Sequence, residues 1–358
     1  MKPRHQTRPQ PTLLDVARAA EVSRTTASNA FNRPDQLSAA LRDKVLEVAR
    51  ELGYAGPNPM ARMLRTGRAG AIGVVFPEPV TYAFTDPVAI ALLQGIGSVC
   101  EREEAGVLVL SAADVEAVRR TVYQVAVDGF IMECLAADSE VVGAVLERGV
   151  PAVAVDHPGF TEAPSVEIEE RAGARAAAAH VVGLGHRRIG VIALETRPDG
   201  YAGPLDADRR AGAVYGITVE RLAGYEEGLR QSGLDPASMV VEEQRGYGRA
   251  EGAAAARRVL AATPRPSAIL AMSDEFALGA IEAAPGLGLR VPEDLSVVGF
   301  DDAPLAARSS PPLTTVHQPL VEKGRIAAEL LFGRRKAAGP IVLPTRLVIR
   351  GSTAPPPA

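Results

Sequence analysis

From Ala71 onward, short apolar runs rich in β-branched residues alternate with segments of helical length, and this alternation is the strongest constraint on the fold. It is typical of parallel strands connected by helices that cover both faces of a sheet. Seven such strands, spread over the rest of the chain, suit two α/β lobes better than one. The runs are AIGVVF, VLVL, GFIM, PAVAVD, IGVIAL, AILAM and LSVVGF.

Two stretches of this body lack a regular pattern. Residues 193–216 are rich in glycine, aspartate and arginine, which predicts a long loop. Residues 351–358, GSTAPPPA, are predicted to be a flexible tail, and they show no heptad pattern for a tetramerising helix.

The first 69 residues differ in charge from the rest of the chain. They hold 12 Lys and Arg against 6 Asp and Glu, whereas the remainder holds 27 against 37. A small basic segment joined to an acidic body fits a nucleic-acid-binding module joined to a part that does not bind nucleic acid. Chance clustering of arginine is the alternative.

Three short amphipathic helices are predicted in this basic segment. Thr12 and Asp15 form a capping-box-like start, Ser23 caps a second helix, and a third runs from Ser38 to a stop at Gly53. The first two helices are joined by about three residues, which predicts a helix-turn-helix.

The second helix is the predicted reader of DNA. In a helix-turn-helix it enters the major groove, where arginine suits guanine and asparagine suits adenine. The predicted base-reading residues are Arg24, Thr25 and Asn29, and the predicted phosphate-binding residues are Ser23, Thr26, Arg33, Arg42 and Lys44. The alternative is the polar face of an unrelated helical cap, and the helical pattern alone leaves both open.

Residues 57–68 form a predicted linker helix. Asn58 is a good cap, Pro59 suits the first helical position, and Gly67 is a stop. A helix of about two turns is marginal in water, so we expect it to order only with a partner or DNA. The alternative is a flexible tether whose Leu64 packs on its own body.

Catalytic and cofactor motifs are missing from the sequence. It contains no G-x-S-x-G, H-E-x-x-H or G-x-x-x-x-G-K-[ST], and no G-x-G-x-x-G after a strand. Five scattered histidines and two cysteines, Cys100 and Cys134, give no metal-ligand spacing. We therefore expect no catalytic residues, no cofactor and no metal, and hence no enzyme. Few cysteines, no membrane-spanning apolar run and no signal-peptide core favour a cytoplasmic protein without a membrane partner.

Several long segments together resemble the LacI/GalR (lactose-repressor-type) family of bacterial transcription regulators. They are TLLDVARAAEVSRTTASNAFN, LRDKVLEVARELGY, PNPMARMLRTGR with IGVVF, LGHRRIGVI, ERLAGY, SDEFALGAIEA, GLRVPEDLSVVGFDD and PPLTTVHQP. Two departures stand out: Glu21 occupies the turn where the family has a small residue, and Gly56 is extra. Glu21 would carry backbone strain if that site is left-handed.

For the DNA-binding end, the resemblance implies a homodimer on a pseudopalindromic double-stranded operator. The hinge helices of the two chains would pair and insert a leucine into the minor groove, which bends the duplex. By motif position the hinge residues are Leu64, Ala61 and Arg62.

For the body, the resemblance implies a two-lobed, periplasmic-binding-protein-like fold in which the chain crosses between lobes three times. We place the crossings near 162–166, 290–293 and 317–321. The predicted divisions are a disordered basic tail 1–10, a helix-turn-helix domain 11–56, a linker 57–68, a body 69–350 and the tail 351–358. Within the body, the N-lobe would comprise 69–163 and 292–318, and the C-lobe 166–290 and 321–350.

Ligands of open α/β sheets bind beyond the carboxyl ends of strands, so the cleft between the lobes is the predicted effector site. Carboxylates and a guanidinium can hold neighbouring hydroxyls, and an aromatic ring can stack on a sugar. The predicted effector residues are Asp156, Arg221, Tyr247, Asp274, Phe84 and Asp86. For Asp301 and Asp302 a turn-stabilising role is favoured over ligand binding, and for His186 capping or packing is favoured.

The sequence thus predicts a transcription factor, a repressor, whose operator affinity is controlled by a small-molecule effector, a sugar or related metabolite. A solute-binding uptake receptor and a metabolic enzyme that uses the α/β body are the alternatives. The first would need a signal peptide and would not need residues 12–68.

Overall fold

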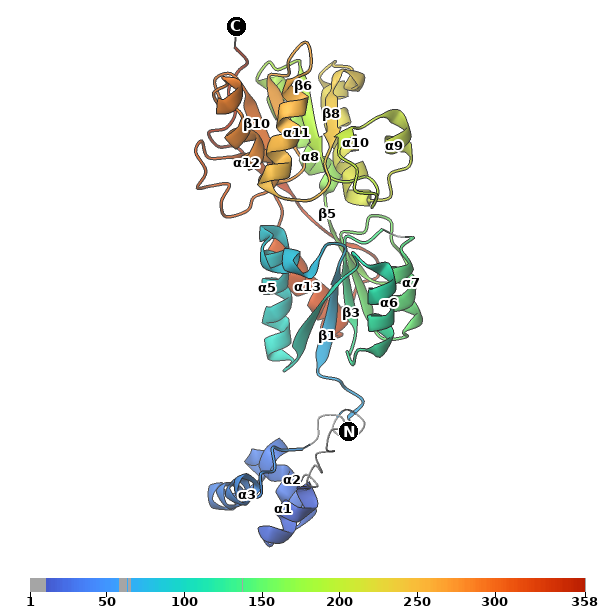
Figure 1. Ribbon diagram of the computed structural model, residues 1–358, viewed down its shortest axis with the longest axis vertical. Coiled ribbons are helices and arrows are strands. Elements are labelled where there is room, and N and C mark those ends of the chain that lie inside the picture. The colour runs from blue at the N-terminus through green and yellow to red at the C-terminus, as the bar shows by residue number, and fades with distance from the viewer. Residues whose placement is uncertain (1–10, 58–62, 64–65, 137, 358) are drawn as a thin grey trace, which may run out of the picture. The chain divides into compact units, whose positions relative to one another are not determined.

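In the computed structural model, the chain divides into two compact units, Met1–Ala69 and Gly70–Ala358 (Figure 1). The structure describes residues 11–57, 63, 66–136 and 138–357. The predicted tail 1–10 and most of the predicted linker helix lie outside these residues. Within the described ranges, no helix is both long and apolar enough to cross a membrane.

The first unit contains three α-helices around a small core of alanine and valine. Each begins at the predicted cap: Thr12 and Asp15 close a capping box, and the hydroxyls of Ser23 and Ser38 accept N–H bonds from Thr26 and Leu41. The elements are α1 (Leu13–Ala19), α2 (Arg24–Asn32), the short η1 (Pro34–Gln36) and α3 (Ala39–Glu51). The core residues are Val16, Ala17, Ala20, Ala27, Ala30, Val45 and Ala49.

The turn between α1 and α2 contains Glu21 in a left-handed conformation, with φ of 56°. This conformation costs a residue with a side chain roughly 1–2 kcal/mol. The departure at Glu21 is therefore a site of stored backbone strain.

We expect Glu21→Gly to raise the free energy of unfolding of the first unit by about 0.5–1 kcal/mol, because glycine relieves the strain but loses more entropy on folding. Urea unfolding followed by circular dichroism would measure the change. Glu21→Ala keeps the strain and should give no such gain. A stability loss in Glu21→Gly would contradict this explanation.

The second unit contains two sheets, and most strands in each sheet are parallel to their neighbours. The first has the order β12-β5-β4-β3-β1-β2 and is parallel throughout. Its strands are β1 (Ala71–Phe76), β2 (Gly106–Ser111), β3 (Phe130–Glu133), β4 (Ala152–Val155), β5 (Ser165–Ile168) and β12 (Ile341–Leu343).

The second sheet has the order β13-β11-β10-β9-β6-β8-β7, and its edge strands β13 and β7 are antiparallel to their neighbours. Its strands are β6 (Ile189–Ala193), β7 (Gly203–Pro204), β8 (Val240–Glu243), β9 (Ala268–Ala271), β10 (Ser296–Asp301), β11 (Thr314–His317) and β13 (Arg346–Val348).

Helix pairs cover both faces of each sheet, which confirms the predicted α/β architecture (Figure 1). On the first sheet they are α5 (Pro87–Arg102) with α13 (Leu320–Leu331), and α6 (Val115–Gln124) with α7 (Glu140–Glu147). On the second they are α8 (Glu170–Gly183) with α10 (Gly216–Gln231), and α11 (Arg249–Leu260) with α12 (Asp274–Ala283). Short helices η2 (Val80–Phe84), α9 (Ala207–Ala211), η3 (Pro236–Ser238) and η4 (Pro285–Leu287) lie in the connections.

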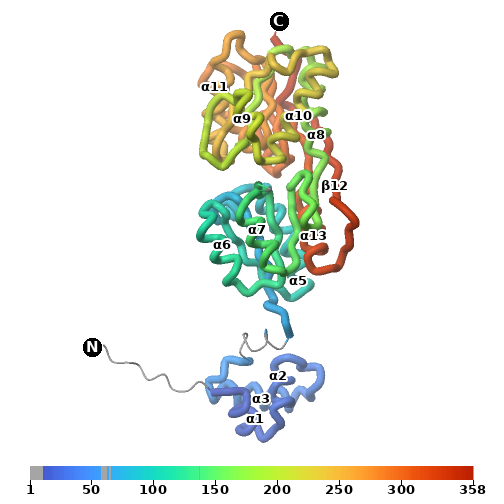
Figure 2. Tube along the Cα trace, turned by 90° about the vertical axis from the view of Figure 1, so that its right-hand side faces the viewer, coloured from blue at the N-terminus to red at the C-terminus, as the bar shows by residue number. Residues whose placement is uncertain are grey.

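The chain crosses between the lobes at Ile168–Glu170, His317–Leu320 and Leu343–Arg346. Consequently the N-lobe comprises residues 70–168 and 320–343, so α13 and β12 pack beside N-terminal elements (Figure 2). The predicted lobe bounds were wrong at two places. Residues 290–293 do not cross between lobes, because they connect η4 to β10 inside the C-lobe. Residues 292–317, predicted in the N-lobe, therefore belong to the C-lobe, and residues 321–343, predicted in the C-lobe, belong to the N-lobe.

Two stretches predicted to be irregular are structured. The segment 193–216 contains β7 and α9. Arg209 pairs with Asp199 inside the segment and with Glu243 of β8 outside it. In the predicted flexible tail, the buried Ser352 hydroxyl accepts a bond from the Thr314 N–H at 2.8 Å and donates to the Val297 carbonyl at 2.6 Å. The first residues of the tail are thus part of the C-lobe.

Candidate functional site

The first candidate surface is the exposed face of α2. Arg24 and Thr25 are exposed at its first turn, and Asn29 lies one turn further on the same face as Thr25. The Asn29 side-chain amide donates to the Gln36 carbonyl oxygen at 3.2 Å, which orients Asn29 before any partner binds. The three predicted base-reading residues therefore share one solvent-facing patch.

The predicted phosphate-binding residues divide into two kinds. Arg33, Arg42 and Lys44 are exposed cations. The Ser23 hydroxyl already caps α2 by accepting the Thr26 N–H at 3.0 Å, and it is also hydrogen-bonded to the Thr26 hydroxyl at 2.8 Å. These two hydroxyls have a helix-capping role in addition to the predicted one. The predicted hinge residues Ala61, Arg62 and Leu64 lie outside the described residues.

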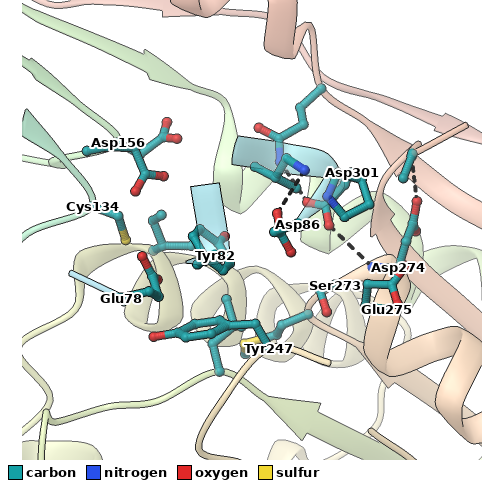
Figure 3. Close-up of a pocket in the computed structure, with 18 of the residues that line it drawn as sticks. Glu78, Tyr82, Asp86, Cys134, Asp156, Tyr247, Ser273, Asp274, Glu275 and Asp301 are labelled. Carbon is teal, nitrogen blue, oxygen red and sulfur yellow. Dashed lines mark hydrogen bonds between the residues drawn. The ribbon is translucent and has the colours of Figure 1, made fainter. Parts of the chain in front are cut away.

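The second candidate site is a pocket in the second unit, lined from the carboxyl ends of strands in both sheets (Figure 3). Five of the six predicted effector residues line it: Asp86, Asp156, Arg221, Tyr247 and Asp274. Phe84 does not, because η2 ends there and leaves its ring 66% exposed. The remaining lining residues are Glu78, Tyr82, Pro87, Val88, Glu133, Cys134, Leu194, Ile217, Met272, Ser273, Glu275, Asp301, Ala303 and Gln318.

Arg221 lies within α10 and is buried in a dense set of contacts. Its guanidinium pairs with both carboxylate oxygens of Glu170, at 2.6 and 3.2 Å, and donates to the Met272 carbonyl. It also lies 3.7 Å from the centre of the Phe300 ring. Burial alone would lower the pKa of Arg221, but the adjacent Glu170 carboxylate raises it above its ordinary value. Much of the donor capacity of this arginine is therefore used inside the protein.

Asp274 and Asp301 lie next to each other at one side of the pocket (Figure 3). Asp274 accepts bonds from the Thr315 hydroxyl and, at 2.7 Å, from the Ala303 N–H. Asp301 accepts a bond from the Gln318 amide at 2.7 Å. Burial raises the pKa of Asp301 to about 7, and burial followed by the charge of Asp301 raises that of Asp274.

Asp302 and His186 have structural contacts away from the pocket. Asp302 pairs with Arg350 at 2.6 Å and with His317 at 3.0 Å. His186 is buried and hydrogen-bonded to Ser267 at 2.9 Å and Ser296 at 3.0 Å. Asp301, for which a turn role was favoured, lines the pocket instead.

Three further carboxylates line the opposite side of the pocket, and two of them, Glu78 and Glu133, were not among the predicted effector residues. Glu133 is the last residue of β3, Asp156 directly follows β4, and Glu78 follows β1 by two residues. Because β4, β3 and β1 are neighbours in the first sheet, the three side chains gather at one edge. The signal for Glu78 and Glu133 was available, since each follows a short apolar run.

Burial is the largest influence on the pKa values of Glu78 and Glu133. It raises the pKa of Glu78 to about 7. Burial likewise raises the pKa of Glu133 well above its ordinary value, and the charges of Glu78 and Asp156 add to the rise. The Lys323 ammonium on α13 donates to one oxygen of Asp156 and, at 2.8 Å, to the Gln318 carbonyl oxygen.

Two tyrosines supply the flat apolar surface of the pocket. The rings of Tyr82 and Tyr247 lie 5.2 Å apart, centre to centre, and are tilted by 58° (Figure 3). Aromatic faces surrounded by carboxylates suit a ring that carries hydrogen-bond donors. Among the described residues, no group of histidine, cysteine and carboxylate side chains has the arrangement of a metal site.

Comparison with known proteins relates both surfaces to bacterial regulators. Residues 12–58 match the family model for bacterial regulatory proteins of the lacI family, and residues 178–353 match that for a periplasmic binding protein-like domain. The HTH-type transcriptional regulator Rv3575c of Mycobacterium tuberculosis is 41% identical over 353 residues, covering 97% of this chain and 98% of the relative.

Two solved structures with a bound small molecule cover nearly the whole chain. The Lac repressor dimer bound to operator and the anti-inducer ONPF has a TM-score of 0.75, 30% identity and coverage of 96% of this chain and 99% of that one. A complex of the transcriptional regulator CelR with cellobiose has a TM-score of 0.67, 31% identity and coverage of 96% and 99%.

Proposed function

The chain belongs to the LacI family of bacterial regulatory proteins. From this premise we propose that it represses transcription by binding a specific operator. Its affinity for the operator would change when a small polyhydroxylated metabolite binds in the pocket. The observation that carries the proposal is the pocket itself. One concave site brings together carboxylates from both sheets and two tyrosine rings, which is the chemistry that binds hydroxyl-rich rings.

At the DNA end, Arg24, Thr25 and Asn29 of α2 would read base edges in the major groove, and Arg33, Arg42 and Lys44 would hold phosphates. We propose that the protein acts as a homodimer on a pseudopalindromic site, in the cytoplasm. The operator-bound Lac repressor is a dimer, which supports this arrangement. Two heads then read two half-sites related by the dimer axis.

The effector would act through the linker. A short helix is marginal by itself, so a small change in the spacing of two paired bodies can decide whether two linker helices, with Ala61, Arg62 and Leu64, form on DNA. A coupling free energy of typically 1–3 kcal/mol changes operator affinity about 5- to 150-fold, which is enough for regulation.

The proposal is tested by selecting duplexes from a randomised pool with the full-length protein. We expect recovery of sequences with two inverted half-sites, bound at least about 10³-fold more tightly than unselected DNA. Asn29→Ala should reduce affinity for the selected duplex by about 1–3 kcal/mol per half-site and relax the preference at the contacted base. Arg50→Gln, on the exposed side of α3, is the control and should retain selectivity. Failure to enrich any sequence would refute the DNA-binding assignment.

A further inference from the structure

Two buried carboxylate oxygens in the pocket lack partners. Glu78 and Asp156 are only 6% and 7% exposed, and both line the pocket. Within the described part of the chain, neither Glu78 Oε2 nor Asp156 Oδ1 has a hydrogen-bond partner. Buried acceptors are normally satisfied, so the two orphaned oxygens point to a donor that the protein itself does not provide.

The nearby cations are already engaged. Arg221 is bound by Glu170 and the Met272 carbonyl, and Lys323 is bound by the other oxygen of Asp156 and by Gln318. Glu275, at the far side of the pocket, is paired with Arg249 at 2.8 Å. These contacts leave the edge formed by Glu78, Glu133 and Asp156 with more carboxylates than engaged cations. Burial raises the pKa values of Glu78 and Glu133, and the charges of Glu78 and Asp156 add to the rise at Glu133. A bound cation would therefore stabilise the charged forms of these carboxyls as well as supply hydrogen-bond donors.

We propose that the effector carries a protonated amine on a hydroxyl-bearing ring, and that Glu78, Glu133 and Asp156 bind the ammonium group. An ammonium has three donors and no acceptor, which matches two orphaned oxygens and a third carboxylate beside them. This inference rests on the proposed function, since it concerns the same pocket, and it narrows the ligand class from polyols in general to amino sugars and related ring amines.

The aromatic side of the pocket supports the same class. The faces of tyrosine rings attract cations, and Tyr247 and Tyr82 line the pocket together with Glu78. A metal cation is disfavoured, because no metal-like ligand group is present in the described residues. A phosphorylated or carboxylated sugar is disfavoured as well, because it would place negative charge beside this acidic edge.

The test compares matched pairs of ligands that differ only in an amine or a hydroxyl at carbon 2: glucosamine with glucose, galactosamine with galactose, and mannosamine with mannose. Isothermal titration calorimetry on the full-length protein gives both affinities of each pair. We expect at least one amine to bind about tenfold or more tightly than its parent sugar, since hydrogen bonds to charged groups are the stronger ones. Glucose 6-phosphate should bind more weakly than glucose.

Two sets of variants distinguish binding of the amine by Glu78 and Glu133 from a general effect of the protein's negative charge. Glu78→Gln combined with Glu133→Gln keeps the side-chain shapes. In this double variant the amine should bind only about one to three times as tightly as its parent sugar. Glu101→Gln, on the exposed surface of α5, is the matched control and should preserve the preference for the amine. If the double variant fails to fold, the comparison of ligand pairs on the natural protein still decides.

Three outcomes overturn the inference: no amine that binds more tightly than its parent sugar, preference for the phosphorylated sugar, or no binding by any of the three amines. Operator binding is measured separately on the same preparation without sugar. If the selected duplex is bound and a neutral sugar changes that binding, the proposed function stands and only the amine assignment fails. If no duplex is bound, the proposed function itself fails, whatever the sugars show.

Discussion

Replacing Arg221 with methionine is expected to lower the free energy of unfolding by about 3–5 kcal/mol, the usual cost of removing one partner of a buried ion pair. The guanidinium is 4% exposed and holds Glu170, which is equally buried. Without Arg221, Glu170 would be a buried carboxylate that must either remain charged without its cation or take up a proton. Asp301, 3.9 Å from the guanidinium, would lose the same neighbouring charge.

Urea unfolding of the full-length protein, followed by circular dichroism, would measure this loss in the transition of the second unit. The double variant Arg221→Met with Glu170→Leu removes both charges and should recover most of the stability. Arg171→Met is the matched control: Arg171 is about half exposed and pairs with Glu220 on the surface, so its loss should cost about 0–1 kcal/mol. A cost below about 1 kcal/mol for Arg221→Met would show that the pair does not support the lobe.

Raising the salt concentration from 50 to 200 mM is expected to weaken operator binding about 10³-fold. Each head exposes three cations suited to phosphate, Arg33, Arg42 and Lys44, so a dimer would neutralise roughly six phosphates with a log–log slope near −5. Fluorescence anisotropy with a selected duplex, repeated at several salt concentrations, gives this slope.

Two variants distinguish phosphate contacts from base contacts in that experiment. Lys44→Gln should make the slope less steep by about 2, because each dimer carries two copies, and should weaken all duplexes alike. Asn29→Ala should weaken the selected duplex while leaving the slope unchanged. A slope near zero would show that these cations do not contact DNA.

The parts of the fold that the sequence predicts well are those whose signals are local. The three N-terminal helices are capped by Thr12, Ser23 and Ser38, and each cap is recognisable because its hydroxyl and the amide it binds are only three residues apart. The strands of the α/β body are similarly marked by their own β-branched runs. Partners far away in the chain are not needed to recognise either.

The wrong predictions concern segments whose structure depends on residues far away in the chain. β12 and β13 have three residues each and form only because β5 and β11 provide edges to pair with. The crossing at Leu343–Arg346 between them was therefore not predicted, and a crossing was wrongly placed at 290–293. The 351–358 segment has a composition typical of a loop, yet Ser352 binds Thr314 and Val297. Composition contains no information about such contacts.

The pocket shows the same division. Asp156, Arg221, Tyr247 and Asp274 were predicted from their side-chain chemistry and their positions in the sequence, whereas Glu78 and Glu133 emerge only once β4, β3 and β1 are known to be neighbours. Phe84 was misassigned because a residue in a short helix points outward or inward according to the turn that precedes it. Arg221 was predicted to bind the effector, but its pairing with Glu170 was not predicted, because that pair depends on α8 packing beside α10.

The interlaced order of the lobes also constrains how the protein is made. α13 and β12 complete the N-lobe but follow the C-lobe strands β6 to β11 in the chain, and the C-lobe in turn needs β13 and Ser352. During synthesis the helical head can fold as soon as it leaves the ribosome, whereas both lobes must wait for nearly the last codon. A prematurely terminated polypeptide would therefore carry a folded DNA-binding head on an unfinished body, exposed to chaperones and proteases.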